Sequence, residues 1–168
     1  MQQDELNKQL IYACHNDNPG IIQLLLENGA DVNTVDKNDN TPLHIECGWS
    51  GHADIVELLL ANKASVTLVN KNGETPLHDA CMHGHMDIVQ LLLENGADIN
   101  VTSANGQTPL YFACAWGHTE IVKLLLDNGA VINITNEYGF TLLGIACKNG
   151  NKDIVNLLEE HIENQERE

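Results

Sequence analysis

Histidine and cysteine are the side chains of this sequence whose types and spacing could do chemistry, and they gather most densely around residue 80. The group consists of His78, Cys81, His83 and His85. Their nitrogen and sulfur atoms are the donors that zinc takes in a tetrahedral site. Histidine recurs at the places that match positions 78 and 85 elsewhere in the chain, as His44, His52 and His118. This recurrence favours a structural role, in which imidazoles hydrogen-bond neighbouring backbone, so we predict no metal site and no cofactor.

The five cysteines could form disulfides, but their spacing argues against it. They follow one another at intervals of 33, 34, 33 and 33 residues, as Cys14, Cys47, Cys81, Cys114 and Cys147. Each therefore occupies the same place in a repeating unit. Packed helices lie about 8–10 Å apart, beyond the roughly 7 Å between Cα atoms that a disulfide spans. We predict a ladder of small, buried, unreactive thiols, which suits a reducing compartment.

Nothing in the sequence assembles a catalytic site. The serines are Ser50, Ser65 and Ser103, and none stands in the sharp turn of a nucleophile elbow. The glycines recur in periodic turns and form neither a phosphate-binding loop nor a dinucleotide fingerprint. We therefore predict a protein that is not an enzyme.

The charge balance excludes several classes of partner. The chain has 168 residues, with 24 acidic side chains, 8 basic ones and a net charge of −16. No cluster of Lys and Arg is available for phosphate backbones or anionic membranes, so we expect no nucleic-acid and no membrane partner. The start, Met1–Glu5, does not resemble a secretory signal. We expect a cytoplasmic protein, with the nucleus and the cytosol of a host cell left open.

The elements that position these residues repeat about every 33 residues. Thr-Pro-Leu begins at Thr41, Thr75 and Thr108, and Thr141-Leu142-Leu143 continues the series. In one unit, Thr75 caps a helix that begins at Pro76 and ends before Gly84-His85. A second helix follows over 86–94, and a polar segment leads to the tight turn Asn105-Gly106.

The unit resembles an ankyrin repeat. The resemblance rests on Thr75-Pro76-Leu77-His78-Asp79-Ala80, on Gly84-His85, and on the run from Leu91 to Asn100. It implies an all-α solenoid of stacked helix-turn-helix units with β-hairpin-like loops, whose inner helices and hairpin tips form a concave surface. The units span about 4–35, 36–69, 70–102, 103–135 and 136–160, within a single domain over 1–160. Residues 161–168 form an acidic tail that we expect to fray, because its glutamates oppose the helix dipole. The first and last units depart from the pattern as caps do, so we expect a complete array that acts as a monomer.

The second unit departs from the repeat most often. It carries one extra residue near Trp49-Ser50, and Glu46 stands where the other units have alanine. Asp39 and Lys63 replace glycines of the other hairpins and helix ends. These changes predict either sequence drift or a binding element, and both readings stay open.

The resemblance places the large side chains before the Gly-His turns on the concave groove. These are Trp49, Met82, His83 and Trp116, with Phe112, Tyr138 and Phe140 added as further contacts. Glu46, Glu74 and Asp79 supply negative charge there. An aromatic and acidic groove predicts a protein or peptide partner that is basic, or mixed apolar and basic. The alternative is that the aromatic side chains fill space between repeats.

Two further hypotheses come from other classes. The resemblance implies a substrate of asparaginyl hydroxylation, with Asn33 and Asn100 at matching positions and Asn133 at a partial match. The zinc site at His78, Cys81, His83 and His85 is the weaker alternative. An enzyme inhibitor, a scaffold and a secreted effector all fit the same sequence.

Overall fold

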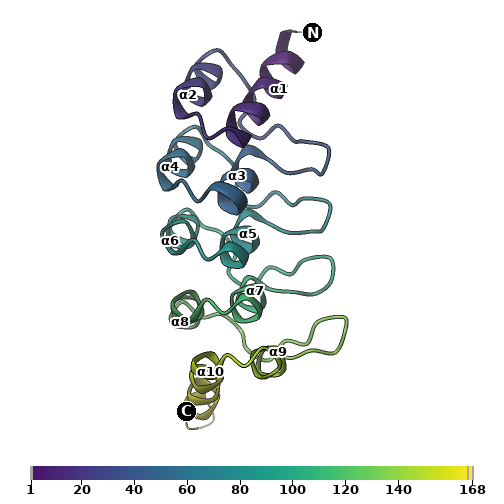
Figure 1. Ribbon diagram of the computed structural model, residues 1–168, viewed down its shortest axis with the longest axis vertical. Coiled ribbons are helices and arrows are strands. Elements are labelled where there is room, and N and C mark those ends of the chain that lie inside the picture. Colours follow the sequence, from purple (N-terminus) through teal and green to yellow (C-terminus); the bar gives the residue numbers. More distant parts are fainter. Residues whose placement is uncertain (1, 166, 168) are drawn as a thin grey trace.

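The protein is a stack of five helix pairs (Figure 1). The computed structural model describes residues 2–165 and 167, and in these residues it has ten α-helices and one short π-helix. The elements are α1 (Gln2–His15), α2 (Pro19–Glu27), α3 (Pro42–Ile45), η1 (Glu46–Ser50), α4 (Ala53–Ala61), α5 (Pro76–His83), α6 (Met86–Glu94), α7 (Pro109–Trp116), α8 (Thr119–Asp127), α9 (Leu142–Lys148) and α10 (Lys152–Gln165). The all-α solenoid that the sequence predicts is confirmed.

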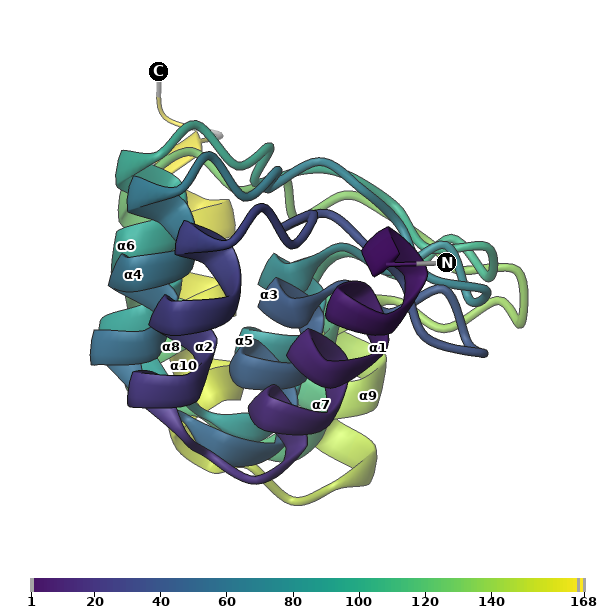
Figure 2. The same cartoon turned by 90° about the horizontal axis from the view of Figure 1, so that it is seen from above.

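The two helices of each pair form separate columns. Viewed along the stack, α2, α4, α6, α8 and α10 form the outer column, and α1, α3, α5, α7 and α9 form the inner one (Figure 2). The loops that join one pair to the next project beyond the inner column on one side. None of the helices among the described residues is long and apolar enough to cross a membrane.

The inner helices α3, α5, α7 and α9 each begin directly after a threonine, and the first three have proline as their first residue. The Thr41 hydroxyl accepts a hydrogen bond from the backbone N–H of His44, and the His44 Nδ1 accepts one from the backbone N–H of Thr41. Both groups would otherwise lack a partner at the helix start. His78 makes the same bond to the Thr75 backbone at 3.0 Å. The predicted caps are therefore present.

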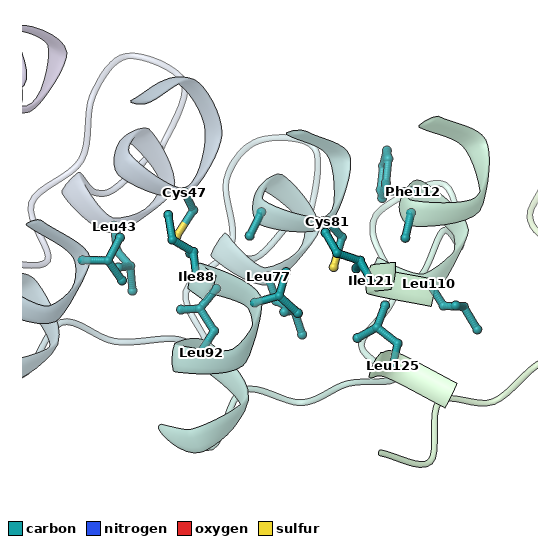
Figure 3. Packing of buried hydrophobic residues seen from close by; sticks show 14 of the residues in the cluster. Leu43, Cys47, Leu77, Cys81, Ile88, Leu92, Leu110, Phe112, Ile121 and Leu125 are labelled. Carbon is teal, nitrogen blue, oxygen red and sulfur yellow. The ribbon is translucent and has the colours of Figure 1, made fainter. Parts of the chain in front are cut away.

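The core runs the length of the stack between the two columns. Figure 3 shows leucines of the inner helices facing isoleucines and leucines of the outer ones, among them Leu43, Leu77, Leu110, Ile88, Leu92, Ile121 and Leu125. Each is almost fully buried. Burial of such a side chain stabilises the fold by about 1.5–3 kcal/mol, so the stack rests on contacts between neighbouring pairs.

The cysteine ladder is confirmed for four of its five members. All five thiols are free, and Cys14, Cys47, Cys81 and Cys114 are buried. Burial raises the pKa of all four, that of Cys114 to about 12, so they stay protonated and unreactive. Cys147 is exposed, contrary to the prediction. It lies on α9, and no further helix pair of the described chain covers that side.

The C-terminal helix is longer than predicted. The sequence predicts fraying from residue 161, but α10 continues to Gln165. Ile162 follows Ile154 and Leu158 at intervals of four residues and packs against the core. This third turn of apolar contact explains why the helix persists despite its glutamates. Of the predicted tail, residues 166 and 168 lie outside the described residues.

Neighbouring hairpins are joined through their backbones. The backbone N–H groups of Lys71, Ala104 and Glu137 donate to the carbonyls of Asn38, Asn72 and Asn105, one repeat earlier, at 2.9–3.1 Å. Among the described residues a single β-bridge, Thr135–Thr141, is formed. The loops are therefore hairpin-like turns held side by side, and they form one wall of the concave face.

Candidate partner-binding groove

A groove of about 360 Å³ lies where the second and third repeats meet. It is lined by the inner elements α3, η1 and α5 and by the hairpins of both repeats. The lining residues are His15, Asn38, Asn40, His44, Ile45, Gly48, Trp49, Asn70, Asn72, Glu74, Asp79, Met82 and His83. This set includes Trp49, Met82, His83, Glu74 and Asp79 from the predicted site.

The extra residue of the second repeat forms the π-helix η1. Its wider turn is closed by a bond of 3.2 Å from the N–H of Gly51 to the carbonyl of Glu46, five residues earlier. Gly51 ends the turn with a φ of 66°, in the left-handed region that glycine favours. The turn carries Trp49, whose side chain is 83 % exposed. Such single π-helical turns occur often at functional sites.

Three rings from two repeats stand together at one end of the groove. The ring centroids of Trp49 and His83 are 6.1 Å apart, and His83 stacks on His85 at 6.1 Å and 9°. The backbone positions both imidazoles: a ring nitrogen of His83 bonds the Asp79 carbonyl at 3.0 Å, and one of His85 bonds the Gly48 carbonyl at 3.1 Å. The Trp49 indole therefore lies beside two imidazoles whose positions are set by hydrogen bonds to the backbone.

The predicted bonding of histidine rings to neighbouring backbone is confirmed for His44, His78, His85 and His118. It is not found for His52, whose ring in the described chain contacts Asp17 instead. The Nε2 atoms of His44 and His78 lie 3.0 Å from the carbonyls of Glu74 and Gln107 in the following hairpins. The Nε2 of His118 lies 2.9 Å from the carbonyl of Met82, in the preceding repeat. The donors of the third repeat do not converge on one point. Among the described residues, the group that could hold a metal ion is a different one, formed by Asp17, Glu46 and His52.

The floor of the groove is acidic and lacks a matching positive charge. The Glu74 carboxylate accepts hydrogen bonds from the side-chain amides of Asn70 and Asn72, both at 3.2 Å. The half-buried Asp79 carboxylate has no ion pair or hydrogen bond in the described structure. Burial, and then the charge of Glu74, raise the pKa of Asp79 to about 8. The lining contains no Lys or Arg, so none of its side chains places a permanent positive charge beside Asp79.

Two residues expected on the groove are buried elsewhere. Glu46 has an exposed fraction of 0 %, and Phe112 one of 6 %. Glu46 occupies the alanine position of the repeat, which faces the core, as the fully buried Ala80 and Ala113 show. Phe112 packs edge-on against His78, with ring centroids 5.7 Å apart. The placement of both on the groove is wrong. Glu46 is a buried acid instead, and burial, followed by the charge of Asp17, raises its pKa to about 8.

The remaining predicted aromatic residues are exposed but do not line this groove. Trp116 ends α7, while Tyr138 and Phe140 lie on the last hairpin. The Lys148 ammonium stands 5.0 Å from the centre of the Phe140 ring, a cation–π contact. The structure therefore separates these three side chains from the cluster around Trp49.

Four hairpin asparagines are the largest group of groove residues that were not predicted from the sequence. Asn38, Asn40, Asn70 and Asn72 line it with amide groups from two adjacent loops. The Asn70 amide also donates to the Asn40 side chain at 3.1 Å and so joins the loops. Asn38 and Asn72 occupy matching hairpin positions, and Asn105 continues the series one repeat later. This recurrence is a signal in the sequence that marks the position for attention.

A larger hollow lies at the N-terminal edge of the stack. It measures about 650 Å³ between α1 and the first hairpin, and Asp4, Lys8, Asp36 and Lys37 are among its lining residues. Acidic and basic groups are mixed there, and no aromatic ring lines it. It therefore lacks the aromatic anchor and the single sign of charge that distinguish the groove beside Trp49.

The asparagines of the hydroxylation hypothesis hold adjacent repeats together. The Asn33 side-chain oxygen accepts from the backbone N–H of Ser65 at 2.8 Å, and that of Asn100 accepts from Val131 at 2.8 Å. This shared bond accounts for the recurrence of asparagine without any modification. The hypothesis gains no support from the structure.

Stacked helix pairs whose hairpins are joined through their backbones define a helical repeat protein. A family model for ankyrin repeats, in three copies, matches residues 10–103 and again residues 98–167. The chain therefore belongs to the ankyrin repeat family. Ankyrin repeats are in general modules for protein–protein interaction and are typically non-catalytic. No curated protein matches the chain.

Proposed function

We propose that the chain binds a segment of a partner protein in the groove beside Trp49, and that this segment carries a lysine or arginine next to an apolar side chain. The observation that carries the proposal is the half-buried, unpartnered carboxylate of Asp79 in a groove whose lining has no Lys or Arg. A guanidinium or ammonium group would supply the hydrogen bonds and the charge that Asp79 lacks.

In this proposal Trp49 and Met82 contact the apolar side chain of the partner segment. Trp49 offers a large exposed ring held beside His83, and tryptophan is among the commonest anchors of interfaces. Met82 is a flexible, polarizable side chain that adapts to the shape of what it contacts. A partner side chain that lies on the indole would also bring its neighbour within reach of Asp79.

The exposed aromatic residues of later repeats extend the proposed contact surface. Trp116 and Tyr138 are 63 % and 64 % exposed, and they follow the groove residues along the stack. In this proposal the chain acts as a monomer in the cytoplasm, the nucleus or a host cytosol. Its net charge of −16 favours encounter with basic proteins and disfavours nucleic acid and anionic membranes.

A displayed library of random peptides tests this function even while the partner is unidentified. Selection on the wild-type protein should enrich peptides that pair lysine or arginine with an apolar residue. These peptides should lose affinity for Trp49→Ala and for Asp79→Asn, and keep it for Leu24→Ala, which removes an exposed apolar side chain from the outer helix α2. Enriched peptides without basic residues, or equal binding to all three variants, would contradict the proposal.

A further inference from the structure

The turn between α1 and α2 differs from the matching turns of the next repeats at position 17, among others. Asp17 stands where the following repeats have Gly51, Gly84 and Gly117, and like them it has a positive φ, of 49°. At Gly51 and Gly84 a glycine is required because the histidine of the next repeat lies directly over the residue. A Cβ at Gly51 would be 2.5 Å from Cε1 of His85, and a Cβ at Gly84 would be 2.6 Å from Cε1 of His118.

This difference releases the histidine of the second repeat from its usual bond. His85 and His118 bond the backbone carbonyls of Gly48 and Met82 in the preceding repeat. His52 occupies the same position, yet within the described chain it makes no such bond. Its Nδ1 lies instead 3.4 Å from a carboxylate oxygen of Asp17, and both side chains are nearly half exposed.

The buried side chain of Glu46 places a third possible metal ligand, a carboxylate oxygen, close to Asp17 and His52. It replaces the alanine of the other repeats, it is fully buried, and neither of its carboxylate oxygens has a hydrogen-bond partner. The Cys14 thiol lies beside it and affects its pKa, but without the geometry of a hydrogen bond. A buried carboxylate without partners is costly, so such groups normally have an ion or a donor at hand. Ligand atoms of Asp17, Glu46 and His52 all lie within 4.8 Å of one another.

We infer that Asp17, Glu46 and His52 bind a divalent transition-metal ion of the zinc class. Two carboxylate oxygens and one imidazole nitrogen are donors that zinc accepts, with a fourth position left for water. Around a tetrahedral zinc ion with bonds of about 2.1 Å, ligand atoms lie about 3.4 Å apart, which matches the separation of His52 and Asp17. Three departures from the repeat pattern thus serve one purpose: an added carboxylate at the glycine position, an added carboxylate at the alanine position, and a histidine freed to join them.

The site joins two successive turns of the stack. Asp17 lies in the turn between α1 and α2, His52 precedes α4, and Glu46 begins η1. A bound ion would therefore tie the first repeat to the second and add to the stability of the folded chain. None of the three residues lines the groove beside Trp49, so the inference does not depend on the function proposed for the groove.

Zinc titration of chelator-treated full-length protein tests the inference. Competition with a chromophoric chelator should give one equivalent of bound Zn²⁺ and should raise the midpoint of thermal unfolding. Asp17→Gly and Glu46→Ala should each weaken binding about tenfold or more and remove the thermal shift. Both variants restore the residue that other repeats carry at the same position, so the fold is preserved.

His83→Ala is the matched control, because it removes an exposed imidazole of the neighbouring repeat and should leave zinc binding unchanged. Failure of the wild-type protein to bind stoichiometric zinc would overturn the inference. Zinc affinity in Asp17→Gly and Glu46→Ala equal to that of the wild-type protein would also overturn it and would assign the binding to surface histidines. Mg²⁺ in excess should not displace Zn²⁺, because magnesium prefers oxygen ligands. Displacement of Zn²⁺ by Mg²⁺ would show that His52 is not a ligand of the ion.

Discussion

The indole of Trp49 and the imidazole of His83 lie 6.1 Å apart, centroid to centroid, and join the π-helical turn of the second repeat to the inner helix of the third. The extra residue of the second repeat therefore does not distort the stack. It creates a turn that carries a large ring beside the groove, while Gly51 returns the chain to α4 at the usual place.

Replacement of Trp49 by alanine should separate binding from stability. Because the side chain is 83 % exposed, the free energy of unfolding should change by no more than about 0.5 kcal/mol. Affinity for a selected peptide should fall by about thirtyfold, as for an anchor worth about 2 kcal/mol. Isothermal titration and urea unfolding of the same preparation measure the two quantities. A large loss of stability with unchanged affinity would show that Trp49 serves packing rather than recognition.

Most of the fold was predictable because the same signals for helix starts, helix ends and core positions recur in each repeat. Thr41 and Thr75 begin helices, Gly84 ends one, and the leucines form the core, so an error in one unit is corrected by the others. Trp49 and Asp79, two of the residues predicted on the groove, are among the residues that line it. The predicted exposure of Glu46 on the groove is wrong. The alanines that other repeats carry at this position indicate a buried site, and an acidic residue type does not change the direction in which the position faces.

Features that occur once were harder to predict. The exposure of Cys147 depends on the absence, among described residues, of a helix pair beyond α9 and α10, which a periodic pattern does not reveal. The length of α10 depends on one side chain, Ile162. The cluster of Asp17, Glu46 and His52 depends on how two turns approach each other in space, and its three members are 35 residues apart in the sequence at most. Such relationships come from packing, so they needed the structure.

Neutralisation of Asp79 should stabilise the protein more as the pH rises. The pKa of Asp79 is raised from 3.8 to about 8, so between these values the folded state binds a proton that the unfolded state has lost. Stability from this group is therefore present at low pH and is lost as the pH rises through 8. Asp79→Asn lacks this loss and should gain roughly 1–3 kcal/mol relative to wild type between pH 5 and pH 8.5.

Urea unfolding of both proteins at the two pH values measures this difference. Asp87→Asn, at an exposed position in the first turn of α6, is the control and should show at most a constant offset. If the difference between wild type and Asp79→Asn were the same at both pH values, the carboxylate would be solvated rather than isolated in the groove.

Loss of His78 should destabilise the repeat through its two backbone bonds. The fully buried ring bonds the Thr75 N–H and the Gln107 carbonyl, at 3.0 Å each. His78→Ala leaves both groups without a partner and opens a cavity, so the free energy of unfolding should fall by roughly 2–4 kcal/mol. His15→Ala, at an exposed position of α1, is the control and should change stability by less than about 0.5 kcal/mol.

The same variant should alter the response to acid. Burial lowers the pKa of His78 below its ordinary value of 6.5, so below pH 6.5 the unfolded state binds protons that the folded state does not. Stability from this group is present above pH 6.5 and is lost as the pH falls through the lowered pKa. His78→Ala should therefore lose less stability than wild type between pH 7.5 and pH 5. An equal loss in both proteins would mean that the imidazole takes up a proton in the folded state.

Replacement by alanine should reduce the free energy of unfolding more at Gly51 than at Gly96, although both glycines have a positive φ. Gly51 and Gly96 have φ values of 66° and 83°, so both substitutions carry the strain of the left-handed region, about 1 kcal/mol. A Cβ at Gly96 meets nothing within 4 Å, whereas one at Gly51 would lie 2.5 Å from the His85 ring. To make room, the ring must leave the Gly48 carbonyl and break their bond.

Gly96→Ala should therefore cost about 1 kcal/mol and Gly51→Ala about 2–3 kcal/mol. The reverse change tests the same strain, because Lys63 has a φ of 67° where the equivalent residues are Gly29, Gly96 and Gly129. Lys63→Gly should raise the free energy of unfolding by about 1 kcal/mol. Urea unfolding of the three variants beside wild type measures all three values. Equal losses at Gly51 and Gly96 would mean that His85 moves aside freely, and the stacked histidines would then add little to the cohesion of the repeats.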